Sequence, residues 1–190
     1  MTDIIPFPNK KYNIIYADPA WKYKSRSSPN QISKYSSTKA NDYYNLLDFE
    51  TIYKLPVNKI ADDNCYLFLW VTFPLLDKSI ITFEKWGFKY KTIGFNWVKT
   101  NKKDGKPFFG VGYYTKSNSE ICLLGVKGKV KPKSNFVSSI IIEPKNEHSK
   151  KPLIVKDRIV ELCGDLPRIE LFARNVGLFE DGWDYWGNEV

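Results

Sequence analysis

Short apolar runs alternate along this chain with segments whose apolar residues recur at helical spacing. Strands are expected at 12–17, 65–71, 88–99, 120–126, 137–142, 168–172 and 183–187, with Ile93, Phe95 and Trp97 on one face. Helices are expected at 42–47, 49–55, 74–86 and 153–162, and Pro56, Gly87 and Gly164 end the last three. This alternation predicts an α/β fold, in which a mostly parallel central sheet is flanked by helices.

The length of 190 residues fits a single domain, 1–190, that can bury a proper core. The polar segments 22–41, 100–116 and 127–135 are expected to form mobile loops. No apolar run approaches the roughly 18 residues of a membrane helix, and the N-terminus lacks the basic and apolar regions of a signal peptide. We therefore expect a cytoplasmic protein with no membrane partner.

The three cysteines, Cys65, Cys122 and Cys163, are scattered and odd in number. They are expected to be buried, reduced thiols rather than a disulfide framework. The one histidine is His148, and no pair of Cys or His residues has the spacing of a zinc site, so no metal is expected. A Ser–His–acid triad would need a Gly-x-Ser-x-Gly turn, which the chain lacks, and His148 is expected to order the loop before Lys151.

The tetrapeptide Asp18-Pro19-Ala20-Trp21 follows directly on the first expected strand. In a parallel sheet, ligands bind outside the carboxyl ends of the strands. A carboxylate and a peptide carbonyl placed there can accept both hydrogens of a flat amino group, while an indole ring covers the base that carries it. The alternative is structural: Asp18 caps a turn at the strand end and Trp21 anchors the core. The tetrapeptide by itself does not decide between the two.

Several further motifs follow the tetrapeptide in a fixed order: 67–72, 97–101, 125–128, 148–152, 169–174 and 182–189. Together with Asp18-Pro19-Ala20-Trp21 they resemble the S-adenosylmethionine-dependent N(6)-adenine methyltransferases whose hallmark is Asp-Pro-Pro-Trp. That family includes messenger-RNA adenosine methyltransferases and many phage and bacterial DNA methyltransferases. The resemblance covers nearly the whole chain from about Asn13. It implies a Rossmann-like methyltransferase fold, with the catalytic strand before the cofactor-binding strand.

The resemblance also implies the roles of individual residues. Asp18, Pro19, Ala20 and Trp21 would form the catalytic segment, with Trp21 stacked on a flipped-out base. The residues implied at the S-adenosylmethionine site are Asp18, Lys151 (methionine carboxylate), Glu170 (ribose hydroxyls), Arg174 (ribose end), Asn188 and Glu189 (near the adenosine). For Lys151 and Arg174 the structural alternative is surface charge, which suits Glu170 less because it lies inside an apolar strand. No Gly-x-Gly-x-x-Gly turn is needed, since this cofactor has no phosphate.

Two segments depart from the family pattern or match it loosely. Ala20 replaces the second proline, so the loop loses a restraint on φ and gains an N–H, while the Pro19 carbonyl stays available. We expect activity to survive this change. Tyr35, within Tyr35-Ser36-Ser37-Thr38, resembles the family's tyrosine after the catalytic loop and is a candidate to close over the substrate.

Two basic loops interleaved with aromatic residues follow expected strands, and the net charge is +8. Lys99, Lys102 and Lys103 are candidate phosphate contacts, as are the lysines of 127–133; the alternative is that these loops are simply solvated. The compact chain resembles phage and bacterial members, which favours DNA as the substrate and a bacterial or phage-infected cell as the location. RNA stays open, as does an inactive partner subunit that only binds nucleic acid. The resemblance also implies a homodimer or a pair of related chains. Methyltransferases that act on glutamine in proteins would grip a similar amide, but they resemble Asn-Pro-Pro-Tyr rather than a motif that begins with Asp.

Overall fold

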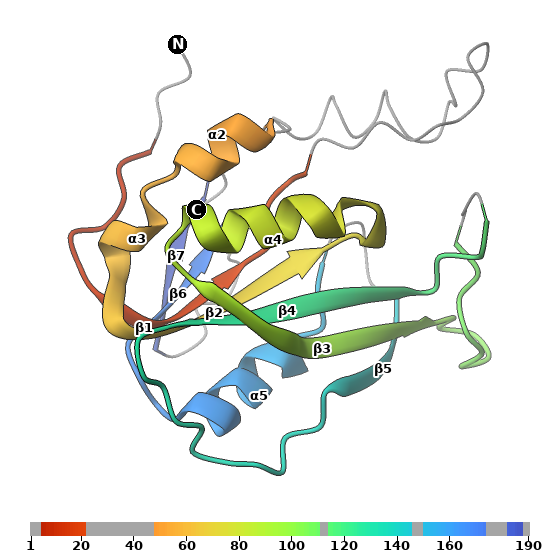
Figure 1. The fold of residues 1–190 in the computed structure, drawn as a ribbon. Helices are drawn as coiled ribbons and strands as arrows, with labels where there is room; N and C mark the ends of the chain where they lie inside the picture. The colour runs from red at the N-terminus through yellow and green to blue at the C-terminus, as the bar shows by residue number, and fades with distance from the viewer. Residues whose placement is uncertain (1–4, 22–47, 111–113, 146–149, 174–181, 188–190) are drawn as a thin grey trace.

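The computed structural model describes residues 5–21, 48–110, 114–145, 150–173 and 182–187, and one twisted sheet organises them (Figure 1). Within these residues the seven strands are β1 (Tyr12–Ala17), β2 (Ala61–Val71), β3 (Lys89–Thr100), β4 (Ser119–Lys127), β5 (Ile140–Pro144), β6 (Arg168–Leu171) and β7 (Trp183–Trp186). Their order across the sheet is β5-β3-β4-β2-β1-β6-β7. The first strand of the sequence therefore lies inside the sheet, where both of its faces are covered.

Strand direction confirms the mostly parallel sheet predicted from the sequence. β1 runs parallel to both of its neighbours, β2 and β6, and β7 continues in the same direction. β4 is antiparallel to β2 and to β3, whereas β5 is parallel to β3. Among the described strands only β4 opposes the others. The carboxyl ends of the remaining strands thus meet at one edge of the sheet, together with the beginning of β4.

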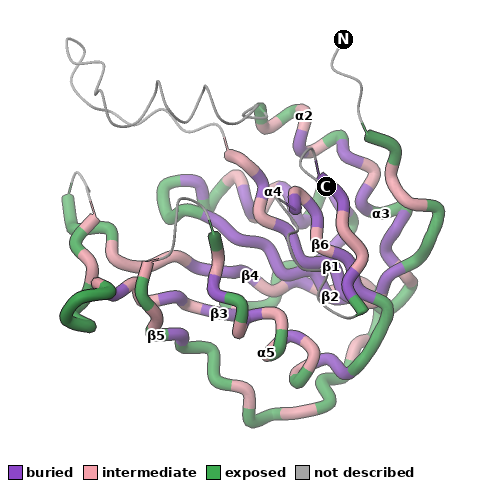
Figure 2. Tube along the Cα trace, turned by 180° about the vertical axis from the view of Figure 1, so that it is seen from behind, coloured by how far each residue is buried: buried purple, intermediate pink, exposed green. Residues whose placement is uncertain are grey.

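Helices cover both faces of the sheet (Figure 1). The helices α2 (Phe49–Lys54), α3 (Val57–Ile60) and α4 (Leu76–Lys85) lie on one face, and α5 (Ile154–Cys163) lies on the other. A short 3-10 turn, η1 (Phe73–Leu75), leads from β2 into α4. Figure 2 shows that buried residues concentrate in the central strands between these layers. No described helix is both long and apolar enough to span a membrane.

Local sequence explains where the helices begin and end. The Asp48 carboxylate accepts a hydrogen bond of 2.7 Å from the Thr51 N–H, which caps the start of α2. Gly87 and Gly164 follow α4 and α5 with φ values of 80° and 95°, a backbone region that favours glycine. The Trp86 indole donates to the Ile52 carbonyl at 2.8 Å and ties α4 to α2.

The sequence-based elements match the structure closely, with differences that have physical reasons. β1 has the predicted bounds. β2 begins at Ala61 rather than at residue 65, because Ala61 pairs with Tyr12 ahead of a register shift that spans the polar residues 62–64, and α3 was not predicted. Ile93 does not share a face with Phe95 and Trp97, because the register shifts between Ile93 and Phe95, so Ile93 pairs with Leu123 on the opposite face. The loop at 22–41 and the helix at 42–47 lie outside the described residues.

The cysteines are free and buried, as predicted. Burial raises the pKa of the Cys65 and Cys163 thiols to about 12, and it raises the pKa of Cys122 well above its ordinary value. All three side chains therefore pack as neutral apolar groups. In the described part of the chain, no group of three or more Cys, His, Asp or Glu residues is placed to hold a metal ion.

A glycine in β4 sets how closely α4 can lie on the sheet. A Cβ built on Gly125 would lie 2.4 Å from the Phe83 ring, which is fully buried between α4 and the sheet. We predict that Gly125→Ala lowers the free energy of unfolding by about 1–3 kcal/mol, because a buried ring must move to make room. Urea unfolding measures this loss.

Gly94→Ala is the matched control for this substitution. It lies in the neighbouring strand β3, and a Cβ there would meet its nearest atoms at 3.4 Å, an ordinary contact. It should change the stability far less. Equal losses for the two variants would contradict the proposed role of Gly125.

Candidate active site

Five charged or aromatic side chains meet at the carboxyl edge of the sheet. They come from the ends of β1, β2 and β3, from the start of β4 and from the segment before α5: Asp18, Trp70, Lys99, Glu120 and Lys151. The reversed direction of β4 is what brings Glu120 to this edge, because Ile121 pairs with Val71 at the carboxyl end of β2. Asp18 lies next to this pair of strands, since Ala17 pairs with Leu69.

Charges of alternating sign form a chain across this edge. The Lys151 Nζ lies 2.7 Å from Asp18 Oδ2 and 3.5 Å from Glu120 Oε2. Glu120 Oε1 also accepts a hydrogen bond from the Lys99 ammonium. The Lys151 ammonium lies 5.4 Å from the Trp70 ring centroid, which adds a cation–π contact. Only 14% of the Lys151 side chain is exposed, so solvent screens these interactions weakly.

The environment fixes the charge of both central members. Burial would lower the pKa of Lys151, but Asp18 and Glu120 outweigh it and raise that pKa above 10.5. Burial would raise the pKa of Glu120, but Lys151 and Lys99 outweigh it and lower that pKa below 4.5. Both groups are therefore charged at neutral pH.

The tetrapeptide Asp18-Pro19-Ala20-Trp21 adopts a tight turn. The Trp21 N–H donates a hydrogen bond of 2.8 Å to the Pro19 carbonyl, which closes a three-residue turn with Ala20 at its centre. The φ of Ala20 is not positive, so the turn belongs to the inverse γ class, in which the central residue has φ near −75°. Proline prefers nearly the same φ. The missing second proline therefore leaves the turn intact.

Trp21 packs against the rest of the protein. Its indole N–H donates to the Trp70 carbonyl at 3.0 Å, and its ring lies 6.1 Å from that of Phe49, centroid to centroid. The ring contacts the core on the α2–α4 side of the sheet. The structural alternative for Trp21 thus describes this conformation, and stacking on a base stays a prediction.

Glu170 lies one strand away from the tetrapeptide Asp18-Pro19-Ala20-Trp21. It is in β6, where it pairs with Tyr16 of β1, and 19% of its side chain is exposed. The Lys156 Nζ of α5 lies 2.7 Å from Glu170 Oε2. The segments expected as strands at 12–17 and 168–172 are thus direct neighbours in the sheet, and a shared role of Asp18 and Glu170 at one site stays a prediction. Tyr35, His148, Arg174, Asn188 and Glu189 lie outside the described residues.

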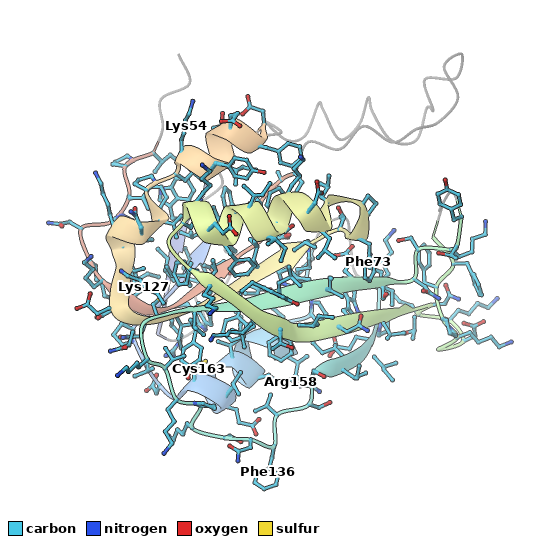
Figure 3. The ribbon with its side chains drawn as sticks, viewed as in Figure 1. Lys54, Phe73, Lys127, Phe136, Arg158 and Cys163 are labelled. Atoms are coloured by element: carbon cyan, nitrogen blue, oxygen red, sulfur yellow. The ribbon has the colours of Figure 1, made fainter. Side chains whose placement is uncertain are left out.

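The two basic loops lie at opposite edges of the sheet. Lys102 and Lys103 are exposed in the loop after β3, at the same edge as Asp18. The segment 127–133 follows β4, and because β4 is reversed it leaves from the other edge, where Lys127 donates to the Ala61 carbonyl. Figure 3 shows Lys127 and Phe73, which follows β2, at opposite ends of the sheet. The segment 127–133 therefore lies at the edge of the sheet away from Asp18, and its expected phosphate contacts stay a prediction.

Lys99 is less available than the sequence suggested. Its side chain is 13% exposed, it is paired with Glu120, and its ammonium lies 5.1 Å from the Trp97 ring centroid. A phosphate contact by Lys99 would have to replace this pair.

Sequence reasoning missed Glu120 and Lys156. Glu120 had a detectable signal, since it begins an apolar strand just as Lys99 ends one, and neighbouring strands often pair opposite charges. Lys156 gave no such signal in the sequence, because its partner Glu170 is brought close only by the packing of α5 on the sheet.

Replacing Glu120 should destabilise the protein in a pH-dependent way. Glu120→Gln leaves Lys99 and Lys151 without their shared carboxylate, and we predict a loss of about 1–3 kcal/mol near neutral pH. Because the pKa of Glu120 is lowered on folding, its contribution is present above 4.5 and is lost as the pH falls through the folded value. The difference in unfolding free energy should therefore narrow in acid.

Urea unfolding of both proteins across a pH series measures this effect. Glu84→Gln, which removes an exposed carboxylate on α4, is the control and should change little. A gap between wild type and Glu120→Gln that widens in acid would contradict the assignment.

Comparison with known proteins gives the family context for this geometry. The MT-A70 family model matches residues 12–189. The chain is 34% identical over 203 residues to the type II methyltransferase M.MunI of a Mycoplasma species, covering all of this chain and 83% of that protein. It is 32% identical over 124 residues to the N6-adenosine-methyltransferase non-catalytic subunit MTB of Arabidopsis thaliana, covering 64% of this chain and 15% of MTB.

A human protein is also similar to this chain over most of its length. The N(6)-adenine-specific methyltransferase METTL4 is 28% identical over 195 residues, covering 95% of this chain. The chain spans 38% of METTL4, so most of that relative's length has no counterpart here. With 178 of 190 residues in the matched range 12–189, the chain belongs to the MT-A70 family.

Proposed function

We propose that this chain is a single methyltransferase domain, 1–190, that transfers a methyl group from S-adenosylmethionine to the exocyclic 6-amino group of adenine in DNA. One observation carries the proposal: Asp18 and the Pro19 carbonyl lie together at the end of a central strand, and Lys151 binds Asp18 at 2.7 Å. A carboxylate and a carbonyl side by side suit an amino group with two hydrogens.

The donors at this edge fit the cofactor. S-adenosylmethionine carries a carboxylate and two ribose hydroxyls, and it supplies an electrophilic methyl group on a sulfonium. Lys151 has three N–H donors, and within the described residues its ion pairs are with Asp18 and Glu120, so it can also bind the methionine carboxylate. Glu170 can accept from the ribose hydroxyls. By resemblance Arg174, Asn188 and Glu189 would complete this site.

Asp18 and Pro19 act on the substrate by position and charge. The adenine amino group is a poor nucleophile, because its lone pair is delocalised into the ring. Hydrogen bonds from the amine to Asp18 and to the Pro19 carbonyl favour a pyramidal, more reactive nitrogen. Lys151 holds Asp18 in place, so no reorganisation is needed at the moment of reaction.

The exposed loop after β3 is the proposed contact for nucleic acid. Lys102 and Lys103 are exposed there, next to Phe109, whose side chain is 68% exposed. Lysines would bind phosphates, and an exposed aromatic ring can stack on a base. The similarity to a type II methyltransferase along the entire chain favours DNA, and a DNA substrate would place the enzyme in the cytoplasm of a bacterial or phage-infected cell.

Two alternatives rest on the similarity to MTB, whose name gives adenosine as its target and a non-catalytic role. An RNA adenosine methyltransferase would use the same site. An inactive partner subunit would not need the pair of Asp18 and Lys151, which is intact here. Pairing with a second copy or a related chain is compatible with either function.

Removing Asp18 should abolish methylation. We predict that Asp18→Ala lowers the rate by at least about 100-fold, since a preorganised charge at the reacting group is lost. Transfer of labelled methyl from S-adenosylmethionine is measured on matched DNA and RNA oligonucleotides, with product nucleosides identified by mass spectrometry. Asp77→Ala, an exposed carboxylate on α4, is the control. Cofactor binding without methylated adenine in any substrate would refute the catalytic proposal, and faster reaction on RNA would refute the preference for DNA.

Restoring the family proline should be harmless. Because the turn over Ala20 has the φ that proline prefers, we predict that Ala20→Pro leaves the methylation rate unchanged and raises stability by about 0.4–1 kcal/mol. The rate assay and urea unfolding measure the two effects. A large fall in rate would show that the N–H of Ala20 or its conformational freedom is needed.

A further inference from the structure

The side chain of Lys156 extends from α5 to the sheet, where its ammonium group lies among the side chains of Glu170, Trp183 and Tyr185. Its Nζ lies 2.7 Å from Glu170 Oε2. The same ammonium lies 5.4 Å from the Trp183 ring centroid and 5.0 Å from that of Tyr185. Only 12% of the Lys156 side chain is exposed.

The register of β6 and β7 explains why these side chains surround the ammonium. Glu170 of β6 pairs with Tyr185 of β7, and Arg168 pairs with Trp183, so these four side chains share the face that α5 covers. Two aromatic rings attract a cation and restrict where it can sit. The ammonium is therefore held in one place, and through it one oxygen of Glu170 is held as well.

Stability alone does not account for a buried pair of this kind. Ordering a lysine side chain costs up to about 2 kcal/mol of conformational entropy. Apolar residues of similar volume can often replace such ion pairs without loss of stability. The pair does supply a carboxylate with one oxygen held by an ammonium. A fixed carboxylate is what two neighbouring hydroxyl groups need in order to donate hydrogen bonds to it.

We propose that Lys156 is a positioning residue for the cofactor site: it orients Glu170 so that Glu170 accepts from the ribose hydroxyls. Lys156 itself does not touch the cofactor and acts only through Glu170. The inference rests on the proposed function, since it requires S-adenosylmethionine to bind at this edge. A lysine that merely fastened α5 to the sheet would contribute to stability and leave ribose recognition unchanged.

Recognition of the ribose separates these two roles. Calorimetry compares the binding of S-adenosylhomocysteine with that of its 2′,3′-dideoxy analogue, which lacks both hydroxyls but keeps the amino acid and the base. We expect wild type to prefer the first compound by about tenfold or more, the effect of losing hydrogen bonds to a charged group. Lys156→Met should lose most of this preference, and Lys156→Arg should keep more of it than Lys156→Met does.

Three further variants sharpen the test. Glu170→Gln should lose the preference by itself, and adding Lys156→Met to it should cause no further loss, because the two residues act as a unit. Lys89→Met, which removes an exposed lysine at the beginning of β3, is the control. If Lys156→Met does not fold, Lys156→Gln takes its place, and NMR of the Glu170 carboxyl in wild type reports whether S-adenosylhomocysteine shifts its signal more than the dideoxy analogue does.

The binding results tell a failure of this inference apart from a failure of the proposed methyltransferase function. A preference that survives in both Lys156→Met and Lys156→Gln, with both compounds weakened equally or not at all, overturns the inference and leaves the methyltransferase proposal standing. The same holds if wild type binds both compounds equally. If wild type binds neither compound, the proposed function fails and the inference fails with it.

Discussion

The ion pair between Lys151 and Asp18 joins parts of the molecule that the chain keeps far apart. Asp18 directly follows the central strand β1, whereas Lys151 lies just before α5, the helix that covers one face of the sheet. The pair sets where the helix begins relative to the sheet and fixes the acid on which the proposed chemistry depends. Glu120 and Lys99 extend it into a chain of alternating charges, so that each buried charge has a partner of opposite sign.

The direction of a single strand makes this cluster possible. If β4 ran with the other strands, Glu120 would lie at the opposite edge, and Lys99 and Lys151 would face each other without a carboxylate between them. Like charges that close would lower each other's pKa and push the loops apart. The reversal of β4 also carries the basic segment 127–133 away from the site. One topological feature therefore determines both the electrostatics of this edge and which basic loop lies beside Asp18.

The sequence predicted the parts of the fold that apolar patterns encode. Runs such as 12–17 define strands because burial on both faces demands unbroken apolar residues, and glycines such as Gly164 mark helix ends through their backbone freedom. Strand direction leaves no such trace, so the pattern marks Glu120 as the start of a strand but does not show at which edge of the sheet it lies. The displacement of Ile93 from the face of Phe95 depends on a register shift that periodicity does not show. The sequence placed Asp18 and Glu170 at their own strands, but only the structure shows that these two strands pair, and Lys156 meets its partner only through helix packing.

The two proposed acceptors of the adenine amine share one design. Within the described residues, each makes one internal hydrogen bond that orients it: Asp18 with Lys151, and the Pro19 carbonyl with the N–H of Trp21. Each oxygen group also has lone pairs beyond the one used, so it can accept a second bond. An acceptor with no internal bond would be free to turn toward water, and one with all its lone pairs used could not bind an amine. The internal bonds thus orient both proposed acceptors in advance, and this preorganisation suits the proposed transfer, which depends on position and charge.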